Sequence, residues 1–170
     1  MTRAALTLLF ILPIASAIPA EEVTIYYDDF GIPHIYAETA EAGLYASGWA
    51  MARDRLVQTL ENYMRGMGRF SEADGAGKND ENVRADLQSL MWDHYGESGR
   101  RYDTLPEAFR RHNAAFVAGI NAFMGENPDE IPSWWTGDVD VYMPVAFSRQ
   151  FLWGWPVGQA AGDLRAAGLR

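Results

Sequence analysis

A single long run of apolar side chains at helical spacing lies between residues 39 and 68. Its members follow one another at steps of four, three, four, four, three and four: Tyr45, Trp49, Ala52, Leu56, Leu60, Tyr63 and Met67. Side chains at these steps share one face of an α-helix, here about six turns long. Thr39 can cap the beginning of this helix, and Gly66 and Gly68 are suited to ending it. Because such a stripe must be buried against other elements, we expect a mainly helical fold.

Two short segments before this helix have the composition of β-strands. Residues 23–27 and 33–37 are rich in β-branched and aromatic side chains. Residues 28–31 separate them, and Gly31 can adopt a positive φ without steric cost. We therefore expect a strand, a turn and a second strand, which makes the fold class α+β and mainly helical.

The rest of the chain divides into a loop, a second helix and an aromatic segment. Residues 71–82 combine glycines with mixed charge and are expected to form a loop. A helix is expected from residues 105–107 onward, with a proline in its first turn. Its apolar face consists of Phe109, Phe116, Ile120 and Phe123. From residue 131 onward aromatic side chains are dense, and this part holds four of the six tryptophans.

The composition excludes several classes of function. A formal net charge of −9 in 170 residues repels phosphate backbones and anionic lipids, so neither nucleic acid nor a membrane surface is expected as a partner. The chain has no cysteine, which excludes disulfides, cysteine-ligated metals and a thiol nucleophile. Its three histidines are too few for a histidine-rich metal cluster.

The first twenty residues have the pattern of an export signal. Arg3 precedes an uncharged apolar run, and Ala15-Ser16-Ala17 offers small side chains to a signal peptidase. The uncharged stretch is 17 residues long and contains two prolines, whereas a transmembrane helix needs about 20 apolar residues, so no stable membrane insertion is expected. We expect residues 1–17, or up to 20, to be removed, leaving residues 21–170 as an exported domain, periplasmic or secreted. A buried helix of the mature domain is the alternative.

The spacing of residues alone gives no catalytic constellation. Ala46-Ser47-Gly48 lies within the long helix and lacks the Gly-x-Ser-x-Gly turn of a serine hydrolase. Residues 75–79 lack the hydroxyl of a phosphate-binding loop, and residues 74–80 lack the alternating ligands of an EF-hand. Taken alone, the soluble exported domain would have no assigned chemistry.

Three polar residues are candidates for a structural or catalytic role. His34 follows a proline in a strand, where a single histidine is more often a hydrogen-bonded structural residue than a catalyst. Asp54 and Arg55 lie near the apolar stripe of the long helix. At least one of these two charges is therefore expected to be partly buried, and a buried charge must be paired.

A longer pattern is far more specific. Residues 29–37 read D-F-G-I-P-H-I-Y-A, residues 45–58 contain G-W-A and A-R-D-R-L-V-Q, and residues 64–72 read M-R-G-M-G-R-F-S-E. This combination resembles the beginning of the penicillin acylase family, which includes the cephalosporin and acyl-homoserine lactone acylases. The resemblance covers nearly all of the mature chain, strongly over residues 23–84 and loosely beyond residue 130.

The resemblance implies an N-terminal-nucleophile amidohydrolase. Such enzymes are exported as inactive precursors that cut themselves into a small α subunit and a large β subunit. The first residue of the β subunit, a serine, is the nucleophile, and its own α-amino group is the general base, because an amine with a pKa of about 8 is partly neutral near pH 7. This chain resembles the signal peptide and most of the α part and ends before the Gly-Ser junction, so no catalytic residue is expected in it. Its fold would be the α-subunit portion of a four-layer αββα assembly.

The resemblance also implies candidate binding residues. The α part of such enzymes lines the acyl pocket, and by position this role maps onto Phe151, Trp153 and Trp155, with a plain core role as the alternative. Burying an acyl chain against such side chains yields roughly 0.8 kcal/mol per CH₂ group. The calcium site found in part of the family takes one carboxylate from this region, for which Asp163 is the nearest candidate across a two-residue gap.

The remaining motif residues are expected to be structural. Gly31, Pro33 and His34 belong to the first stretch of the family pattern. Asp54 and Arg55 resemble the family's buried pair that holds the α-subunit helix to its partner. These five residues are therefore expected to shape the fold and the subunit interface.

Functions of different classes remain open. The first is part of an acylase that cleaves the linear amide bond of an N-acylated substrate, such as a β-lactam antibiotic or an acyl-homoserine lactone, with the nucleophile on a β subunit. The second is a secreted, non-catalytic binding protein for hydrophobic or acylated ligands on the same scaffold, and an inactive truncated fragment is a third. The first predicts that the isolated chain exposes a large apolar surface and hydrolyses no amide.

Overall fold

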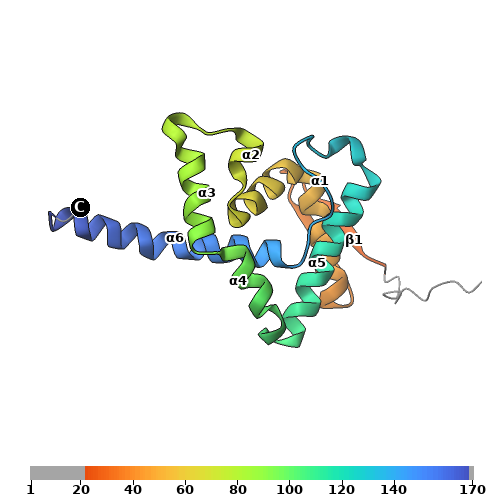
Figure 1. Ribbon diagram of the computed structural model, residues 1–170. Coiled ribbons are helices and arrows are strands. Elements are labelled where there is room, and N and C mark those ends of the chain that lie inside the picture. The colour runs from red at the N-terminus through yellow and green to blue at the C-terminus, as the bar shows by residue number, and fades with distance from the viewer. Residues whose placement is uncertain (1–21, 169–170) are drawn as a thin grey trace, which may run out of the picture.

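The long helix expected from the apolar stripe forms the centre of the fold. In the computed structural model, which describes residues 22–168, helix α1 spans Ala40–Met67 (Figure 1). The side chain of Thr39 accepts a hydrogen bond from the backbone N–H of Ala42, and Gly68 ends the helix with a φ of 71°. Both caps are thus confirmed. The helix is bent at Arg55, whose φ of −150° and ψ of 39° are not helical.

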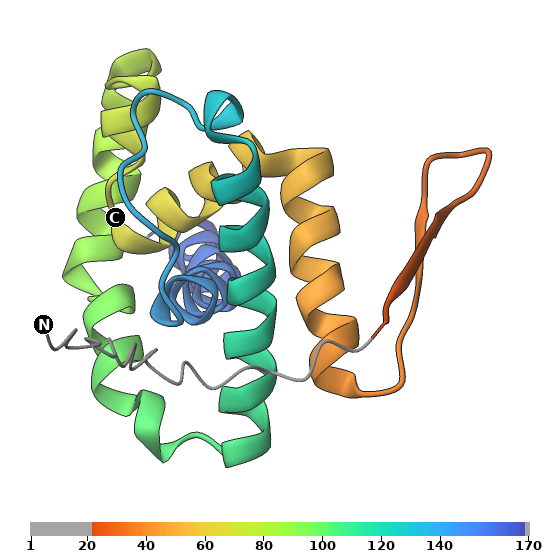
Figure 2. The same ribbon diagram turned by 90° about the vertical axis from the view of Figure 1, so that its right-hand side faces the viewer.

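Helix α5, Glu107–Glu126, lies along α1 and covers its apolar stripe (Figure 2). It begins where the sequence predicts, directly after a proline, and a short 3₁₀ turn, η3 (Pro128–Glu130), follows it. The most enclosed large side chains of the core come from these two helices and are Leu60, Met64 and Ile120. The apolar periodicity of both segments therefore identified the central helix pair correctly.

The backbones of α1 and α5 touch at two glycines. A Cβ atom on Gly48 would lie 2.0 Å from the carbonyl oxygen of Phe116, and one on Gly119 would lie 1.9 Å from that of Tyr45. Real Cβ atoms do not approach an oxygen this closely, so any other residue would push the helices apart. Glycine at these positions sets the distance between the two central helices.

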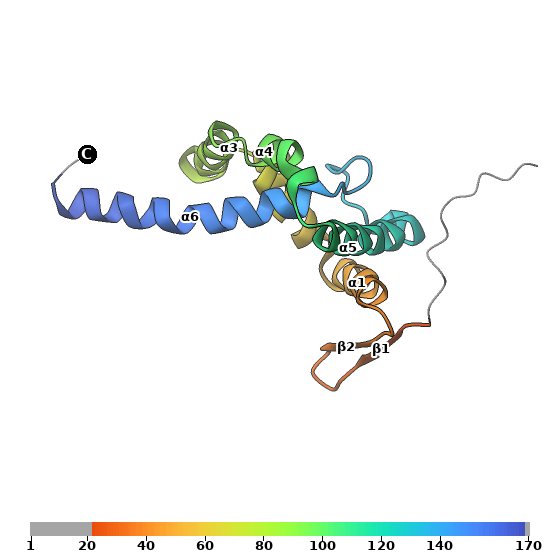
Figure 3. The same cartoon turned by 90° about the horizontal axis from the view of Figure 1, so that it is seen from below.

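Helix α6, Tyr142–Ala166, begins against α1 and α4 and then extends beyond the other helices (Figures 1 and 3). It crosses α1 at Gly66, where a Cβ atom would lie 2.7 Å from the backbone nitrogen of Phe147. The expectation that Gly66 helps to end α1 is therefore wrong, because this glycine lies within the helix and permits the crossing. Pro144 occupies the first turn of α6, where a missing N–H costs nothing, and Pro156 lies in its interior.

Residues 71–82 were expected to be a loop, and the structure corrects this. The segment between α1 and α5 forms α2 (Phe70–Asp74), the 3₁₀ turn η1 (Lys78–Asp80), α3 (Glu81–Met91), α4 (His94–Arg101) and the 3₁₀ turn η2 (Tyr102–Thr104). The buried carboxylate of Asp86 on α3 accepts hydrogen bonds from the backbone of Phe70 at 2.9 Å and of Ser71 at 2.7 Å. A partner from another helix therefore stabilises α2, which is too short to show periodicity.

The expected strands form an antiparallel hairpin of β1 (Thr24–Tyr27) and β2 (Pro33–Tyr36), in which Thr24 pairs with Tyr36. The hairpin stands on the side of α1 that faces away from α5 (Figures 2 and 3). The mainly helical α+β class is confirmed. This hairpin is the only sheet among residues 22–168, so the described chain does not itself form the two central sheets of an αββα fold.

The expected export signal, residues 1–17 or up to 20, lies outside the described residues. Within residues 22–168, no helix combines the length and the apolar character that a bilayer crossing requires.

Candidate functional site

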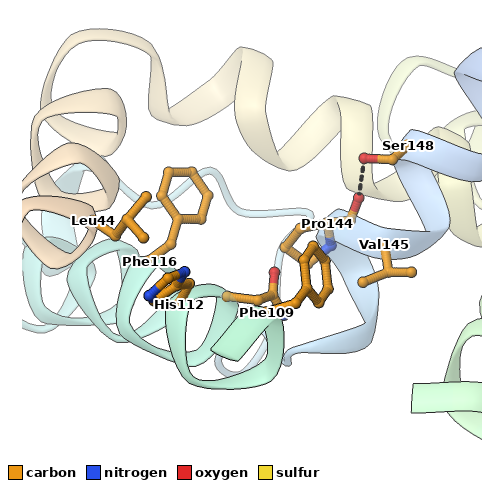
Figure 4. A pocket seen from close by; sticks show the side chains of 8 residues that line it. Leu44, Phe109, His112, Phe116, Pro144, Val145 and Ser148 are labelled. Carbon is orange, nitrogen blue, oxygen red and sulfur yellow. Dashed lines mark hydrogen bonds between the residues drawn. The ribbon is translucent and has the colours of Figure 1, made fainter. Parts of the chain in front are cut away.

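Two adjoining hollows lie where α1, α5 and the first turns of α6 meet. The first has a volume of about 360 Å³ and is lined by Leu44, Phe109, His112, Asn113, Phe116, Pro144, Val145 and Ser148 (Figure 4). The second, of about 230 Å³, is lined by Met51, Thr59, Asn62, Tyr63, Phe116, Pro144, Phe147 and Ser148. They share Phe116, Pro144 and Ser148, so together they form one groove between the central helices and α6.

The polar groups of the first hollow are engaged within the chain. Ser148 donates a hydrogen bond to the carbonyl oxygen of Pro144 at 2.8 Å (Figure 4). The amide of Asn113 donates to the hydroxyl of Tyr102 at 3.0 Å and to the carbonyl oxygen of Val141 at 2.8 Å. Nε2 of His112 lies 3.6 Å from a carboxylate oxygen of Glu41. This hollow is therefore an apolar surface edged by the hydrogen-bonded side chains of Ser148 and Asn113 and by His112, which has only the longer contact with Glu41.

The second hollow has a different wall on α1. Thr59, Asn62 and Tyr63 follow one another at helical spacing and face the hollow together, opposite the apolar side chains of Met51, Phe116 and Phe147. Thr59 and Tyr63 are 5% and 3% exposed. Burial raises the pKa of the Tyr63 phenol, so it remains a hydrogen-bond donor at all ordinary pH values.

The start of α6 is fixed by one carboxylate. An oxygen of Asp140 accepts hydrogen bonds from the backbone N–H groups of Tyr142 at 2.8 Å and Met143 at 3.2 Å. Its other oxygen accepts a hydrogen bond from the hydroxyl of Tyr95 on α4. Burial, and secondly this hydrogen bond to Asp140, raise the pKa of Tyr95 to about 12. The residues of α6 that line the groove are thus held in register with α4.

The structure does not bring the three expected acyl-binding residues together. Phe151 and Trp155 lie four positions apart on one side of α6 and are 69% and 77% exposed. Trp153 lies on the other side and packs edge-on against Trp92 at the end of α3, with ring centroids 5.3 Å apart. None of the three lines either hollow of the groove. Their role in acyl binding stays a prediction.

Asp163 lies near the end of α6 with an exposed side chain. Calcium takes six to eight oxygen ligands, and no group of three or more His, Cys, Asp or Glu side chains among residues 22–168 is arranged to hold a metal ion. The described residues do not fit a calcium shell, to which Asp163 would supply at most two oxygens.

The first motif builds the turn of the hairpin. One oxygen of Asp28 accepts hydrogen bonds from the backbone of Phe30 and Ile32, both at 2.9 Å, and the other lies 3.1 Å from Nε2 of His34. The hydrogen bond from Ile32, and next that from His34, lower the pKa of Asp28. Gly31 has a φ of 76°, as its place in the turn predicts. In this chain His34 stabilises the hairpin through its contact with Asp28, and Gly31 does so by adopting the positive φ of the turn.

Asp54 and Arg55 lie at the bend of α1, and both side chains are exposed. The hydroxyl of Tyr27 donates to a carboxylate oxygen of Asp54 at 3.4 Å, and Arg55 donates to the side chain of Gln58 at 3.1 Å. The expectation that one of these charges is partly buried is wrong for this chain, because both face away from the buried stripe of α1. Pairing with a partner chain stays a prediction.

Comparison with known proteins decides the family. The model of the penicillin amidase family matches residues 22–157, most of the chain. The chain belongs to the penicillin amidase family. The resemblance of the sequence motifs to this family is thereby confirmed, and with it an amide-hydrolase class for the complete members.

Among its curated relatives in the penicillin amidase family, penicillin acylase 2 proenzyme of Pseudomonas sp. strain SE83 is 34% identical over 60% of this chain and 13% of its own length. The acyl-homoserine lactone acylase QuiP of Pseudomonas syringae pv. syringae strain B728a is 24% identical over 72% of this chain and 15% of its own length. This chain therefore spans about a seventh of these relatives. A thermostable penicillin G acylase from Alcaligenes faecalis shares the fold, with a TM-score of 0.67 and 21% identity over 79% of this chain and 73% of the matched chain.

In this member of the penicillin amidase family, the sequence places Tyr63, Phe109 and Phe116 on apolar helix faces but does not predict that they line a groove. The signal was present as spacing: positions 59, 62 and 63 share one face of α1, positions 109, 112 and 116 one face of α5, and positions 144, 147 and 148 one face of α6. The sequence does not show where these three faces meet, because the crossing of the helices depends on the backbone contacts at their glycines.

Proposed function

We propose that this chain is the α part of an acylase that cleaves the linear amide bond of an N-acylated substrate, such as a β-lactam antibiotic or an acyl-homoserine lactone. A separate β subunit would carry the serine nucleophile and its α-amino base. Membership of the penicillin amidase family supports the reaction class, and the names of two curated relatives support these two substrate types.

The observation that carries the proposal is the exposed outer half of α6 (Figures 1 and 3). Phe151, Leu152 and Trp155 are 69%, 68% and 77% exposed on a helix that extends beyond the other helices. Large apolar side chains gathered in this way mark a surface that another molecule covers. A β subunit of the same enzyme would cover it.

The lengths of the matched chains support the same arrangement. This chain covers 13% and 15% of the two curated relatives, but 73% of the matched chain in the solved acylase. That matched chain is therefore much shorter than the curated relatives. A polypeptide of about this extent thus occurs as a separate chain in a solved acylase, which supports a role for this chain beside a larger one.

In such an enzyme the serine of the β subunit would attack the amide carbonyl, release the amine and form an acyl-enzyme that water hydrolyses. This chain would supply apolar surface for the acyl group. Export through residues 1–20 and a carboxylate ligand from Asp163 for calcium belong to the same proposal, and the other calcium ligands would come from the β subunit.

Co-expression tests the proposal. We would produce residues 21–170 alone, and together with a β-type chain of the penicillin amidase family from the same organism, and measure hydrolysis of N-acyl p-nitroanilides. We expect no turnover by the chain alone, and both copurification and turnover with the β chain. Turnover by the chain alone would refute the proposal, and so would failure of the two chains to associate.

A matched pair of variants tests the surface. Trp155→Asp should abolish copurification, because it places a charge in the proposed interface. Leu87→Asp is the control, since Leu87 is also an exposed apolar residue, 60% exposed, but lies on α3. Equal loss of association in both variants would show that the outer half of α6 is not the interface.

A further inference from the structure

Arg149 on α6 is a partly buried positive charge without a partner. Among residues 22–168, its guanidinium takes part in no hydrogen bond, ion pair or contact with an aromatic ring. Its Nε is fully enclosed and unpartnered. Its two terminal NH₂ groups are not fully enclosed, so a group from outside the chain can reach them.

The other partly buried arginines of the described chain have partners. The guanidinium of Arg65 lies over an aromatic ring, with its Cζ 3.3 Å from the ring centroid. A terminal nitrogen of Arg110 lies 3.6 Å from a carboxylate oxygen of Asp103. Arg84 on α3 also lacks an ion pair, but it is exposed and water solvates it. Among residues 22–168, Arg149 is thus the only partly buried arginine with neither a carboxylate nor a ring beside it.

The surroundings of Arg149 supply no negative charge. His94 on α4 packs against α6, is 4% exposed, and has an enclosed Nδ1 that is also unpartnered. Burial, and next the charge of Arg149, lower the pKa of His94, so its ring is neutral at pH 7. Asp93, the acid whose charge acts on this ring, already pairs with Arg100. The described part of the chain therefore offers Arg149 no counter-charge.

The position of Arg149 indicates where a counter-charge comes from. Arg149 lies three positions before Leu152 on the same side of α6, at the inner end of the exposed outer half of this helix. In the free chain, water solvates the terminal NH₂ groups. A partner that covers Leu152 also removes this water from Arg149, and a charge taken out of water must be paired to be tolerated.

We propose that a carboxylate side chain of the β subunit pairs with Arg149 and fixes the position of α6 in the assembled enzyme. A carboxylate fits because it accepts two parallel hydrogen bonds from a guanidinium and cancels its charge. Such a pair selects the partner chain by charge as well as by apolar fit. The inference rests on the proposed function in that it takes the β subunit as the partner.

The binding test uses Arg149→Met, which keeps an unbranched apolar stem and removes the charge. Arg84→Met is the matched control, because Arg84 also lacks an ion pair but is exposed on α3. Residues 21–170 with either change are titrated calorimetrically into the isolated β chain. We expect Arg149→Met to weaken binding about 10- to 100-fold, because it leaves the carboxylate buried and unpaired, and the control to change it less than 2-fold.

The outcomes of this titration separate the inference from the proposed function. Equal affinity of the wild-type chain and Arg149→Met would refute the inference and leave the proposed function standing. Failure of the wild-type chain to bind the β chain would refute the proposed function, and the inference with it.

The stability of the isolated chain gives a second readout of the opposite sign. If the partner of Arg149 is absent from this chain, Arg149→Met should leave the midpoint of urea unfolding unchanged or raise it, because it removes an unpaired, partly buried charge. A lower midpoint would place the partner within the chain itself and overturn the inference.

A double-mutant cycle identifies the carboxylate. Each aspartate and glutamate of the β chain is replaced in turn by asparagine or glutamine, and binding is measured with the wild-type chain and with Arg149→Met. We expect one acid whose replacement weakens binding to the wild-type chain but has little effect on binding to the variant. If no acid of the β chain is coupled to Arg149, the inference is wrong.

Discussion

The backbone contact between α1 and α5 gives the sharpest stability prediction. In Gly119→Ala the new Cβ atom would lie 1.9 Å from the carbonyl oxygen of Tyr45 and 2.9 Å from the backbone nitrogen of Trp49. Both neighbours are backbone atoms of α1, so no side-chain rotation relieves the contact. A carbon–oxygen contact normally lies at about 3.3 Å or more, and the helices must therefore separate by about 1.4 Å.

The expected cost follows from this separation. Overfilling a packed core costs typically about 1–3 kcal/mol when side chains can adjust. Here two helix backbones must move, so we expect about 3 kcal/mol, reduced by about 0.5–1 kcal/mol because alanine favours the helix. At about 2–4 °C per kcal/mol for a chain of this size, the melting temperature should fall by roughly 4–10 °C.

Thermal unfolding followed by far-UV circular dichroism at low protein concentration measures this cost. Gly125→Ala is the matched control on the same helix, because nothing lies within 4 Å of its Cβ position. This control should leave the melting temperature unchanged or raise it slightly. A Gly119→Ala variant as stable as the control would refute the close contact of α1 and α5.

Three other changes should give results of known direction. Asp86→Ala removes the buried carboxylate that holds the start of α2 and should lower the free energy of unfolding by about 2–3 kcal/mol. Asp86→Asn keeps one acceptor oxygen and should lower it less. Equal losses in a urea titration would contradict the stabilising role of the two hydrogen bonds to Asp86. Folding raises the pKa of Tyr95 from about 10 to about 12, so the neutral phenol of Tyr95 contributes stability that is present below pH 10 and is lost as the pH rises through 12. Tyr95→Phe should therefore flatten the decline of the free energy of unfolding between pH 10 and 12. An unchanged decline would show that ionisation of Tyr95 does not cause it. Replacing Phe151 and Trp155 together by serine should increase the solubility of the isolated chain without changing its melting temperature, which centrifugation and dichroism test; an equally insoluble variant would count against the role assigned to this surface.

The sequence predicts those elements whose pattern is local and long. The stripe on α1 and the apolar face of α5 extend over several turns, so periodicity places both helices, and residue type places the caps of α1 at Thr39 and Gly68. The hairpin follows from two β-branched segments and a glycine at positive φ. The residue pattern did not predict α2, α3, α4 or α6 as helices. Helix α2 has only five residues and depends on a carboxylate from α3.

The candidate site is harder to predict because it depends on where helices cross. Glycine commonly ends helices, yet Gly66 lies inside α1, where the absence of a side chain permits the close contact with α6. The position of Asp54 beside the buried stripe suggests burial, but its phase on the helix directs it outward. The aromatic density of α6 is visible in the sequence. That Trp153 lies on the other side of the helix from Phe151 and Trp155, against Trp92, is seen only in the structure.

The central claim is that amide hydrolysis requires this chain and a separate chain with the nucleophile. The most direct measurement is a titration of purified residues 21–170 into a fixed amount of isolated β chain, with turnover of an N-acyl p-nitroanilide as the signal. We predict negligible rates for either chain alone and a rate that rises until the two are equimolar. Full turnover by one chain alone, or a rate that does not depend on the amount of this chain, would contradict the account.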